Sequence, residues 1–167
     1  MNVVDDRIEP TLAKLLKAMV GAESSDLHLV AGYRATYRIH GRLSATSGEV
    51  LTPEQTEAMV ASILPLSEGI EALQNLDCSV SLRRDGEPCR FRANAFLAQG
   101  KLGACFRYIP NEIPSFDWLG FPEVLADKII HLTNGLVIIT GITGSGKSTT
   151  LAAVIQRLNL EGGYRII

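Results

Sequence analysis

The sequence lacks long apolar runs, paired cysteine motifs and a large net charge. No stretch of its 167 residues approaches the roughly eighteen consecutive apolar positions of a membrane-spanning helix, so we expect no transmembrane segment. No basic region followed by an apolar stretch opens the chain, which predicts the absence of a signal peptide. A net charge of −2 gives no reason to expect nucleic acid or an anionic membrane as a partner.

Cysteine is scarce, and its spacing excludes the common paired sites. The three cysteines, Cys78, Cys89 and Cys105, form no C-x-x-C motif, and an odd number leaves one unpaired in any disulfide scheme. Reduced, partly buried thiols in a cytosolic protein are therefore expected. With 46% hydrophobic and 20% charged residues, the composition suits one or two small globular domains.

What the sequence does contain is a glycine-rich phosphate-binding loop. Gly141–Ser148 has the pattern G-x-x-x-x-G-K-[ST], in which glycines let the backbone turn its N–H groups inward around a phosphate. Lys147 would place its charge on the β- and γ-phosphates, and the Ser148 hydroxyl is the expected Mg²⁺ ligand. The residues predicted to contact a nucleoside triphosphate here are Gly141, Ile142, Thr143, Gly144, Ser145, Gly146, Lys147, Ser148 and Thr149.

The residues on both sides of the loop support this interpretation. Leu136–Thr140 is a continuous apolar and β-branched run, which is typical of a strand buried on both faces. After the loop, apolar residues recur at helical spacing at Leu151, Val154, Ile155 and Leu158. The sequence therefore predicts a strand–loop–helix unit rather than a glycine-rich turn that happens to carry a lysine.

The N-terminal part of the chain predicts a small α+β domain. An amphipathic helix should open near Pro10 and bury one apolar face. That face consists of Leu12, Leu15, Leu16, Met19 and Val20. Two strands are expected next, over Ser25–Val30 and Ala35–His40, with a turn at His40-Gly41.

A second helix and three more strands are expected further along this domain. Thr52 is the predicted N-cap, Gln55 closes a capping box, and the helix should end near Leu64. A shorter helical piece is predicted over Glu68–Leu76. The three strands, separated by turns at Asp85-Gly86 and Gln99-Gly100, are Cys78–Arg83, Cys89–Leu97 and Leu102–Tyr108.

A change of composition divides the chain. Between residues 110 and 122, three prolines together with Asn111, Ser115 and Gly120 indicate a linker. We therefore expect residues 1–110 to form the N-terminal domain and 111–122 the linker. Residues 123–167, which begin with a predicted helix, would be the start of a nucleotide-binding domain.

Basic residues gather on the predicted strands of the first domain. Residues 77–110 contain six basic and three acidic side chains, within a chain of negative net charge. Arg90 and Arg92 are two apart and share a sheet face, and a two-residue turn at Gln99-Gly100 would set Arg92 opposite Arg107. Like charges in that position destabilise a ladder unless an anion lies between them. Either these arginines are solvated on an open sheet face, or they meet nucleotide phosphates bound by the same or a neighbouring subunit.

Asp26 and His28 would share one face of the first predicted strand. A metal site or a catalytic role requires further partners, and the nearby sequence offers none. We interpret both as surface residues or as hydrogen-bonded structural residues.

Several segments, taken in order and with their spacing, resemble one family. They are Ser25-Asp26-Leu27-His28-Leu29, Arg38 followed by Gly41, Arg90–Phe96, Phe106–Pro110 and Gly135–Ala153. These segments resemble the type IV pilus retraction ATPases of the PilT type, within the secretion ATPase (GspE/PulE) superfamily. Because the resemblance covers nearly the whole chain, it is more specific than the loop alone.

This resemblance implies a fold, an activity and partners. It implies a PAS-like N-terminal domain followed by the first strand–loop–helix unit of a RecA-like ATPase domain. It also implies a homohexameric ATPase that uses ATP and Mg²⁺ to drive pilus disassembly. Such a ring is cytoplasmic, lies peripherally at the inner membrane and contacts a platform protein at the pilus base. The residues that match the family's nucleotide, metal and interface positions are Lys147, Ser148, Thr149, Arg90, Arg92 and Arg107.

The sequence departs from the family pattern in two places. Tyr33-Arg34-Ala35 follows Gly32, where family members often have two prolines. No acidic box with its catalytic glutamate, no Walker B segment and no histidine box occurs up to Ile167, so we expect an N-terminal fragment without turnover of its own. Because Leu136–Thr140 would lack sheet neighbours, we expect it to pair or associate with another surface. The alternatives are a secretion or pilus-extension relative, and a non-catalytic PAS-like assembly module with a vestigial loop.

Overall fold

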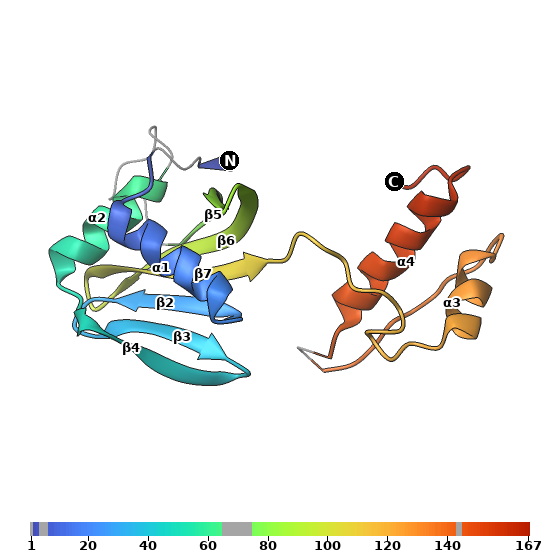
Figure 1. The fold of residues 1–167 in the computed structure, drawn as a ribbon, viewed down its shortest axis with the longest axis horizontal. Coiled ribbons are helices and arrows are strands. Elements are labelled where there is room, and N and C mark those ends of the chain that lie inside the picture. The colour runs from blue at the N-terminus through green and yellow to red at the C-terminus, as the bar shows by residue number, and fades with distance from the viewer. Residues whose placement is uncertain (1, 4–6, 65–74, 143–144) are drawn as a thin grey trace. The chain divides into compact units, whose positions relative to one another are not determined.

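A seven-stranded sheet forms the centre of the first of two units. Contacts divide the chain into Met1–Asn111 and Glu112–Ile167, and the computed structural model describes residues 2–3, 7–64, 75–142 and 145–167. The sheet has the order β1-β5-β6-β7-β2-β3-β4, and its neighbours are antiparallel except β1 and β5 (Figure 1). The strands are β1 (Asn2–Val3), β2 (Asp26–Val30), β3 (Arg34–Ile39), β4 (Arg42–Val50), β5 (Asn75–Arg84), β6 (Glu87–Ala98) and β7 (Lys101–Ile109).

Two helices, α1 (Pro10–Gly21) and α2 (Pro53–Ile63), pack on one face of this sheet. The core joins their apolar faces to every second residue of the central strands. Fully buried members of this core include Leu16, Val60, Leu27, Phe91 and Phe106. Because side chains alternate along a strand, the positions between these strand residues lie on the opposite face, away from α1 and α2. The first unit is a mixed α+β fold, as predicted.

Local signals placed the helix starts correctly. Thr52 Oγ1 accepts a hydrogen bond from Gln55 N at 3.3 Å, and Gln55 Oε1 accepts one from Thr52 N at 2.9 Å, which confirms the predicted capping box. Pro10 begins α1 as expected, and the Glu9 carboxylate, 2.8 Å from Leu12 N, serves as its cap.

The two predicted hairpin turns of the sheet are confirmed. Asp85 and Gly86 connect β5 to β6, and Gln99 and Gly100 connect β6 to β7. All four residues have positive φ, as type I′ turns require. The second turn fixes the register of β6 against β7 and sets Arg92 directly opposite Arg107, as predicted.

Two predicted elements differ from the structure or fall partly outside the described residues. Of the helical piece predicted over Glu68–Leu76, residues 68–74 lie outside the described part, and the last two residues belong to β5. The prediction that Leu136–Thr140 forms a strand is wrong for the described residues, none of which pairs with it. An apolar run becomes a strand only when neighbouring backbone groups complete its ladder. Here Leu136 is 83% exposed and Ile138 is 71% exposed.

The second unit has two helices, α3 (Glu123–Ile130) and α4 (Lys147–Glu161). Its small core consists of Phe116, Ala126, Ile130, Ala153 and Val154. Arg157 of α4 forms ion pairs with Glu123 and Asp127 of α3, which ties the two helices together at the surface. The segment 112–122 groups with this unit and contributes Phe116 to its core.

The three cysteines are free thiols, as expected from their number and spacing. Cys78 and Cys89 are buried, and Cys105 is half-buried. Burial raises the pKa of Cys78 and of Cys105 above the ordinary thiol value. These thiols are therefore protonated and weakly nucleophilic at neutral pH.

Candidate functional site

The first candidate site is the N-terminus of α4. The helix begins at Lys147 after Gly146, whose φ of 84° lies in the left-handed region. No side chain caps this end, and its first turn contains no acidic residue. The first backbone N–H groups of a helix have no partner within the helix and carry partial positive charge. This end of α4 is therefore suited to an anion.

The loop before α4 is shaped by close approach of its own backbone. Ser145 N donates a hydrogen bond to Ile142 O at 3.2 Å, which curls the loop. A Cβ at Gly141 would lie 2.6 Å from Ser145 Oγ, and Gly141 has a φ of 154°, so a larger residue here would be strained and would displace the serine side chain. Thr143 and Gly144, which the sequence predicts as part of the loop, lie outside the described residues.

Lys147 and Ser148 lie together at the start of α4. The Lys147 ammonium donates a hydrogen bond to Ile142 O at 2.8 Å, so its side chain folds back over the loop. Thr149 follows in the same first turn. Lys147 and Ser148 also contribute to a cavity of about 250 Å³. Its other lining residues are apolar: Phe121, Ile129, Val137, Ile139, Leu151 and Val154.

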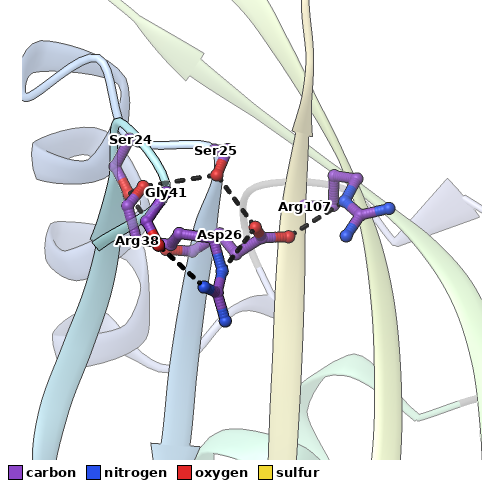
Figure 2. A network of polar contacts seen from close by, with 6 residues as sticks. All are labelled: Ser24, Ser25, Asp26, Arg38, Gly41 and Arg107. Carbon is purple, nitrogen blue, oxygen red and sulfur yellow. Dashed lines mark hydrogen bonds and ion pairs between the residues drawn. The ribbon is translucent and has the colours of Figure 1, made fainter. Parts of the chain in front are cut away.

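The second candidate site is a row of charged residues on the face of the sheet that α1 and α2 leave open. Arg38 on β3 and Arg107 on β7 are both direct cross-strand neighbours of Asp26 on β2. Arg92 on β6 extends the row, because it is the cross-strand neighbour of Arg107. Figure 2 shows the Asp26 carboxylate lying between the guanidinium groups of Arg38 and Arg107.

Asp26 is the centre of this row. Its carboxylate accepts hydrogen bonds from Arg107 Nε at 2.9 Å and from Ser25 Oγ at 2.8 Å, and Arg38 Nε lies at 3.4 Å. The Asp26 side chain is only 5% exposed. Burial by itself would raise the pKa of Asp26, but the hydrogen bonds from Ser25 and Arg107 and the charge of Arg107 outweigh it. The pKa of Asp26 is therefore below its ordinary value, and the group is charged at neutral pH.

Arg92 has a different carboxylate partner. Its Nη2 lies 3.0 Å from Asp77 Oδ2 and its Nε lies 3.4 Å from Asp77 Oδ1, and both side chains are more than half exposed. The hydrogen bond from Arg92 lowers the pKa of Asp77. Each of the opposed arginines thus has its own protein carboxylate, and the sheet needs no external anion to tolerate them. Arg90 lies on the same face, and its side chain makes no hydrogen bond or ion pair with any described residue.

The row borders a cavity of about 330 Å³, which is lined by Asp26, Asp77, Arg92, Asn94, Cys105 and Arg107. His28 also faces this side of the sheet, and its buried Nε2 meets no hydrogen-bonding partner in the part of the chain that the structure describes. Burial and then the charge of Arg38 lower the pKa of His28, so the ring is neutral at pH 7. The interpretation of Asp26 as a hydrogen-bonded structural residue is confirmed. His28 Nε2, in contrast, has no hydrogen-bonding partner among the described residues.

The sequence did not reveal that Asp26 contacts Arg107. These residues are far apart in the chain and meet only because β2 pairs with β7. Asp77 is one of the three acidic residues of segment 77–110, and the composition of that segment assigns it no partner. The Asp85-Gly86 hairpin register sets Asp77 opposite Asn94 and Ser79 opposite Arg92, so Asp77 is a diagonal neighbour of Arg92 on the same sheet face. That register was the available signal.

None of the described helices is both long and apolar enough to span a bilayer. Among the same residues, no group of three or more histidine, cysteine, aspartate or glutamate side chains is arranged to hold a metal ion.

Comparison with known proteins defines the class of protein. The profile of the family described as "Type II/IV secretion system protein" matches residues 2–167. The chain belongs to this family.

Its relatives include pilus ATPases. The chain is 35% identical to the type IV pilus ATPase PilU of Pseudomonas aeruginosa, over 92% of this chain and 40% of PilU. It is also 35% identical to the PilT retraction ATPase of the same organism, over 93% of this chain and 45% of PilT. These matches confirm the resemblance to PilT-type pilus ATPases.

A solved structure supports the same relationship. The crystal structure of the pilus retraction motor PilT with bound ADP is similar to this chain with a TM-score of 0.73 and 33% identity. The match covers 87% of this chain and 42% of that protein. The chain therefore spans less than half the length of the relatives that it matches.

Proposed function

We propose that this chain supplies the N-terminal domain and the ATP-binding loop of a type IV pilus retraction motor. The observation that carries the proposal is the glycine loop that leads into the uncapped N-terminus of α4, in a chain that belongs to this family. The PilT structure with bound ADP supports a nucleotide as the ligand. Hydrolysis of ATP would then drive pilus disassembly in the complete gene product, meaning the whole polypeptide that the gene encodes.

The residues at the start of α4 fit ATP and Mg²⁺. The N–H groups at this helix end and in the loop Gly141–Thr149 would hold the phosphates, and Lys147 would neutralise the β- and γ-phosphate charge. The Ser148 hydroxyl offers Mg²⁺ the hard oxygen ligand that the ion prefers. Bound Mg²⁺ would further neutralise the phosphate charge during transfer. By itself the 167-residue chain is proposed to be inactive.

The assembly is also a proposal. A homohexamer at the cytoplasmic side of the inner membrane would bring the arginine face of one subunit toward the nucleotide of the next, and a platform protein at the pilus base would be the partner. Arg90, Arg92 and Arg107 would then meet phosphate groups, for which the guanidinium group is well suited. We further propose that the first unit is PAS-like, that 111–122 is the linker, and that the second unit opens a RecA-like domain.

Two other functions remain as alternatives. One is a secretion or pilus-extension ATPase, which would use the same loop. The other is a non-catalytic assembly module in which the loop is vestigial. Surface pili in a strain that lacks the gene separate the first alternative from the proposal. Loss of a retraction motor should leave pili that no longer shorten, loss of an extension motor should leave no pili, and loss of a secretion ATPase should leave pili that still retract.

ATP hydrolysis by the complete gene product separates the second alternative from the proposal. Lys147→Ala should abolish turnover, whereas the matched variant Lys128→Ala, on exposed α3, should retain it. A complete gene product that hydrolyses no ATP, or that hydrolyses it equally well without Lys147, contradicts the proposal.

A further inference from the structure

We propose that Asp26 is a positioning residue that holds Arg107 so that its two terminal amino groups face an incoming triphosphate. This inference rests on the proposed function, since it concerns the nucleotide that a neighbouring subunit would bind. It adds a role for a buried carboxylate and a ranking among the three arginines of the open sheet face.

Arg107 is bound to Asp26 through Nε alone. Its Nε donates to Asp26 Oδ1 at 2.9 Å, while Nη1 and Nη2 meet no acceptor among the described residues. Figure 2 shows one of these nitrogen atoms pointing away from Asp26, while the other lies on the same edge of the guanidinium as Nε. Because a guanidinium is planar and rigid, fixing Nε also fixes the direction of both terminal amino groups. Arg107 is 70% exposed, so a phosphate can reach them.

The Asp26 carboxylate is itself held in place by neighbouring donors. Ser25 Oγ donates to Oδ2 at 2.8 Å, and Arg38 pairs with the same oxygen while its Nη1 donates to Gly41 O at 3.2 Å. The Ser24 hydroxyl joins the backbones of β2 and β3 by contacts to Asp26 O and Arg38 O. A carboxylate with three donors and 5% exposure has little freedom to rotate. Arg107 is therefore oriented before any ligand arrives, which lowers the entropic cost of binding.

The three arginines differ in which of their side-chain donors are both available and held in a fixed direction. Arg92 commits one terminal amino group, Nη2, to Asp77 at 3.0 Å, so a phosphate must compete with that carboxylate for it. Arg90 has its donors available, but no described residue orients its side chain. Arg107 alone among the three combines a fixed orientation with two available terminal donors. A phosphate can bind it in the bidentate manner without breaking the pair with Asp26.

A double-mutant cycle on ATP hydrolysis by the complete gene product tests this role. Asp26→Asn and Arg107→Ala should each lower kcat/KM for MgATP by about tenfold or more. Because Asp26 acts through Arg107, the double variant should be no worse than Arg107→Ala. The matched control is Asp85→Asn, which alters an Asp–Arg pair in an exposed turn and should leave kcat/KM unchanged.

Arg107→Lys provides a second variant that does not depend on the stability of Asp26→Asn. A lysine keeps the charge and can pair with Asp26, but its single ammonium cannot also present an oriented fork. We expect this variant to be as impaired as Arg107→Ala. Activity of Arg107→Lys within about twofold of the unmodified protein would overturn the inference, as would multiplicative effects in the double variant.

Lys147→Ala separates the failure of this inference from the failure of the proposed function. If Lys147→Ala is as active as the unmodified protein, the proposed function fails, and the inference fails with it. If Lys147→Ala is inactive while Asp26→Asn and Arg107→Lys are fully active, only the positioning role of Asp26 is overturned.

Discussion

Arg92 and Arg107 lie directly opposite each other on β6 and β7, and each is compensated by a carboxylate on its other side. Asp77 lies on β5 and Asp26 lies on β2, so two aspartates flank the two arginines across four neighbouring strands. The two pairs differ in burial, since the Asp26 side chain is 5% exposed and that of Asp77 is 53% exposed. This difference predicts unequal contributions to stability.

Asp26→Asn should lower the free energy of unfolding by about 2 kcal/mol at pH 7, because a buried carboxylate with charged donors is lost. Asp77→Asn is the matched control. Its exposed ion pair is screened by water, so the change should be clearly smaller than that of Asp26→Asn. Urea unfolding followed by circular dichroism measures both. Equal effects of the two variants would contradict the difference in burial.

The contribution of Asp26 should also depend on pH. Its pKa in the folded protein is lowered, so the unfolded chain takes up the proton more readily as the pH falls. The stabilisation is thus fully present above the ordinary carboxyl pKa of 3.8 and is lost as the pH falls through the lower folded value. The gap in stability between the unmodified protein and Asp26→Asn should therefore shrink below about pH 4. A gap that stays constant from pH 7 to acidic pH would show that Asp26 carries no such charge.

Thr52→Ala should destabilise the first unit by about 1 kcal/mol, because it removes the side-chain acceptor at the start of α2. Thr52→Ser keeps the hydroxyl and is the control. Thermal unfolding compares the two. If the alanine and serine variants unfold at the same temperature, the capping box adds nothing to stability.

The apolar residues before the glycine-rich loop should cause the 167-residue chain to self-associate. Leu136, Ile138 and Ile142 are each more than two-thirds exposed, and the segment has no ladder partner among the described residues. Light scattering should show a mass that rises with concentration, and Leu136→Asp with Ile138→Asp should reduce it. A monomeric unmodified chain at all concentrations would contradict this expectation.

Much of the first unit could be predicted because its signals are local. The Gln99-Gly100 turn and the alternation on either side of it were enough to place Arg92 opposite Arg107. The pairing of β2 with β7 has no such local signal, so the contact between Asp26 and Arg107 remained invisible until the fold was known. The face shared by Asp26 and His28 was predicted, but not what lies on it.

In the second unit, local sequence signals did not predict the structure of the segment before the glycine-rich loop. The prediction that Leu136–Thr140 forms a buried strand is wrong for the described residues, because burial of an apolar strand requires neighbouring strands. The described part of the chain supplies none, so the run stays exposed and extended pairing does not form. The helix after the loop has no such requirement, because its hydrogen bonds are internal, and α4 forms as predicted.

Equilibrium binding of MgATP to the complete gene product tests the central claim most directly. We predict saturable binding at millimolar Mg²⁺, weakened about tenfold or more by Lys147→Ala and unaffected by Lys128→Ala. If the unmodified protein fails to retain ATP, or if both variants bind it equally well, the loop before α4 is not a nucleotide site.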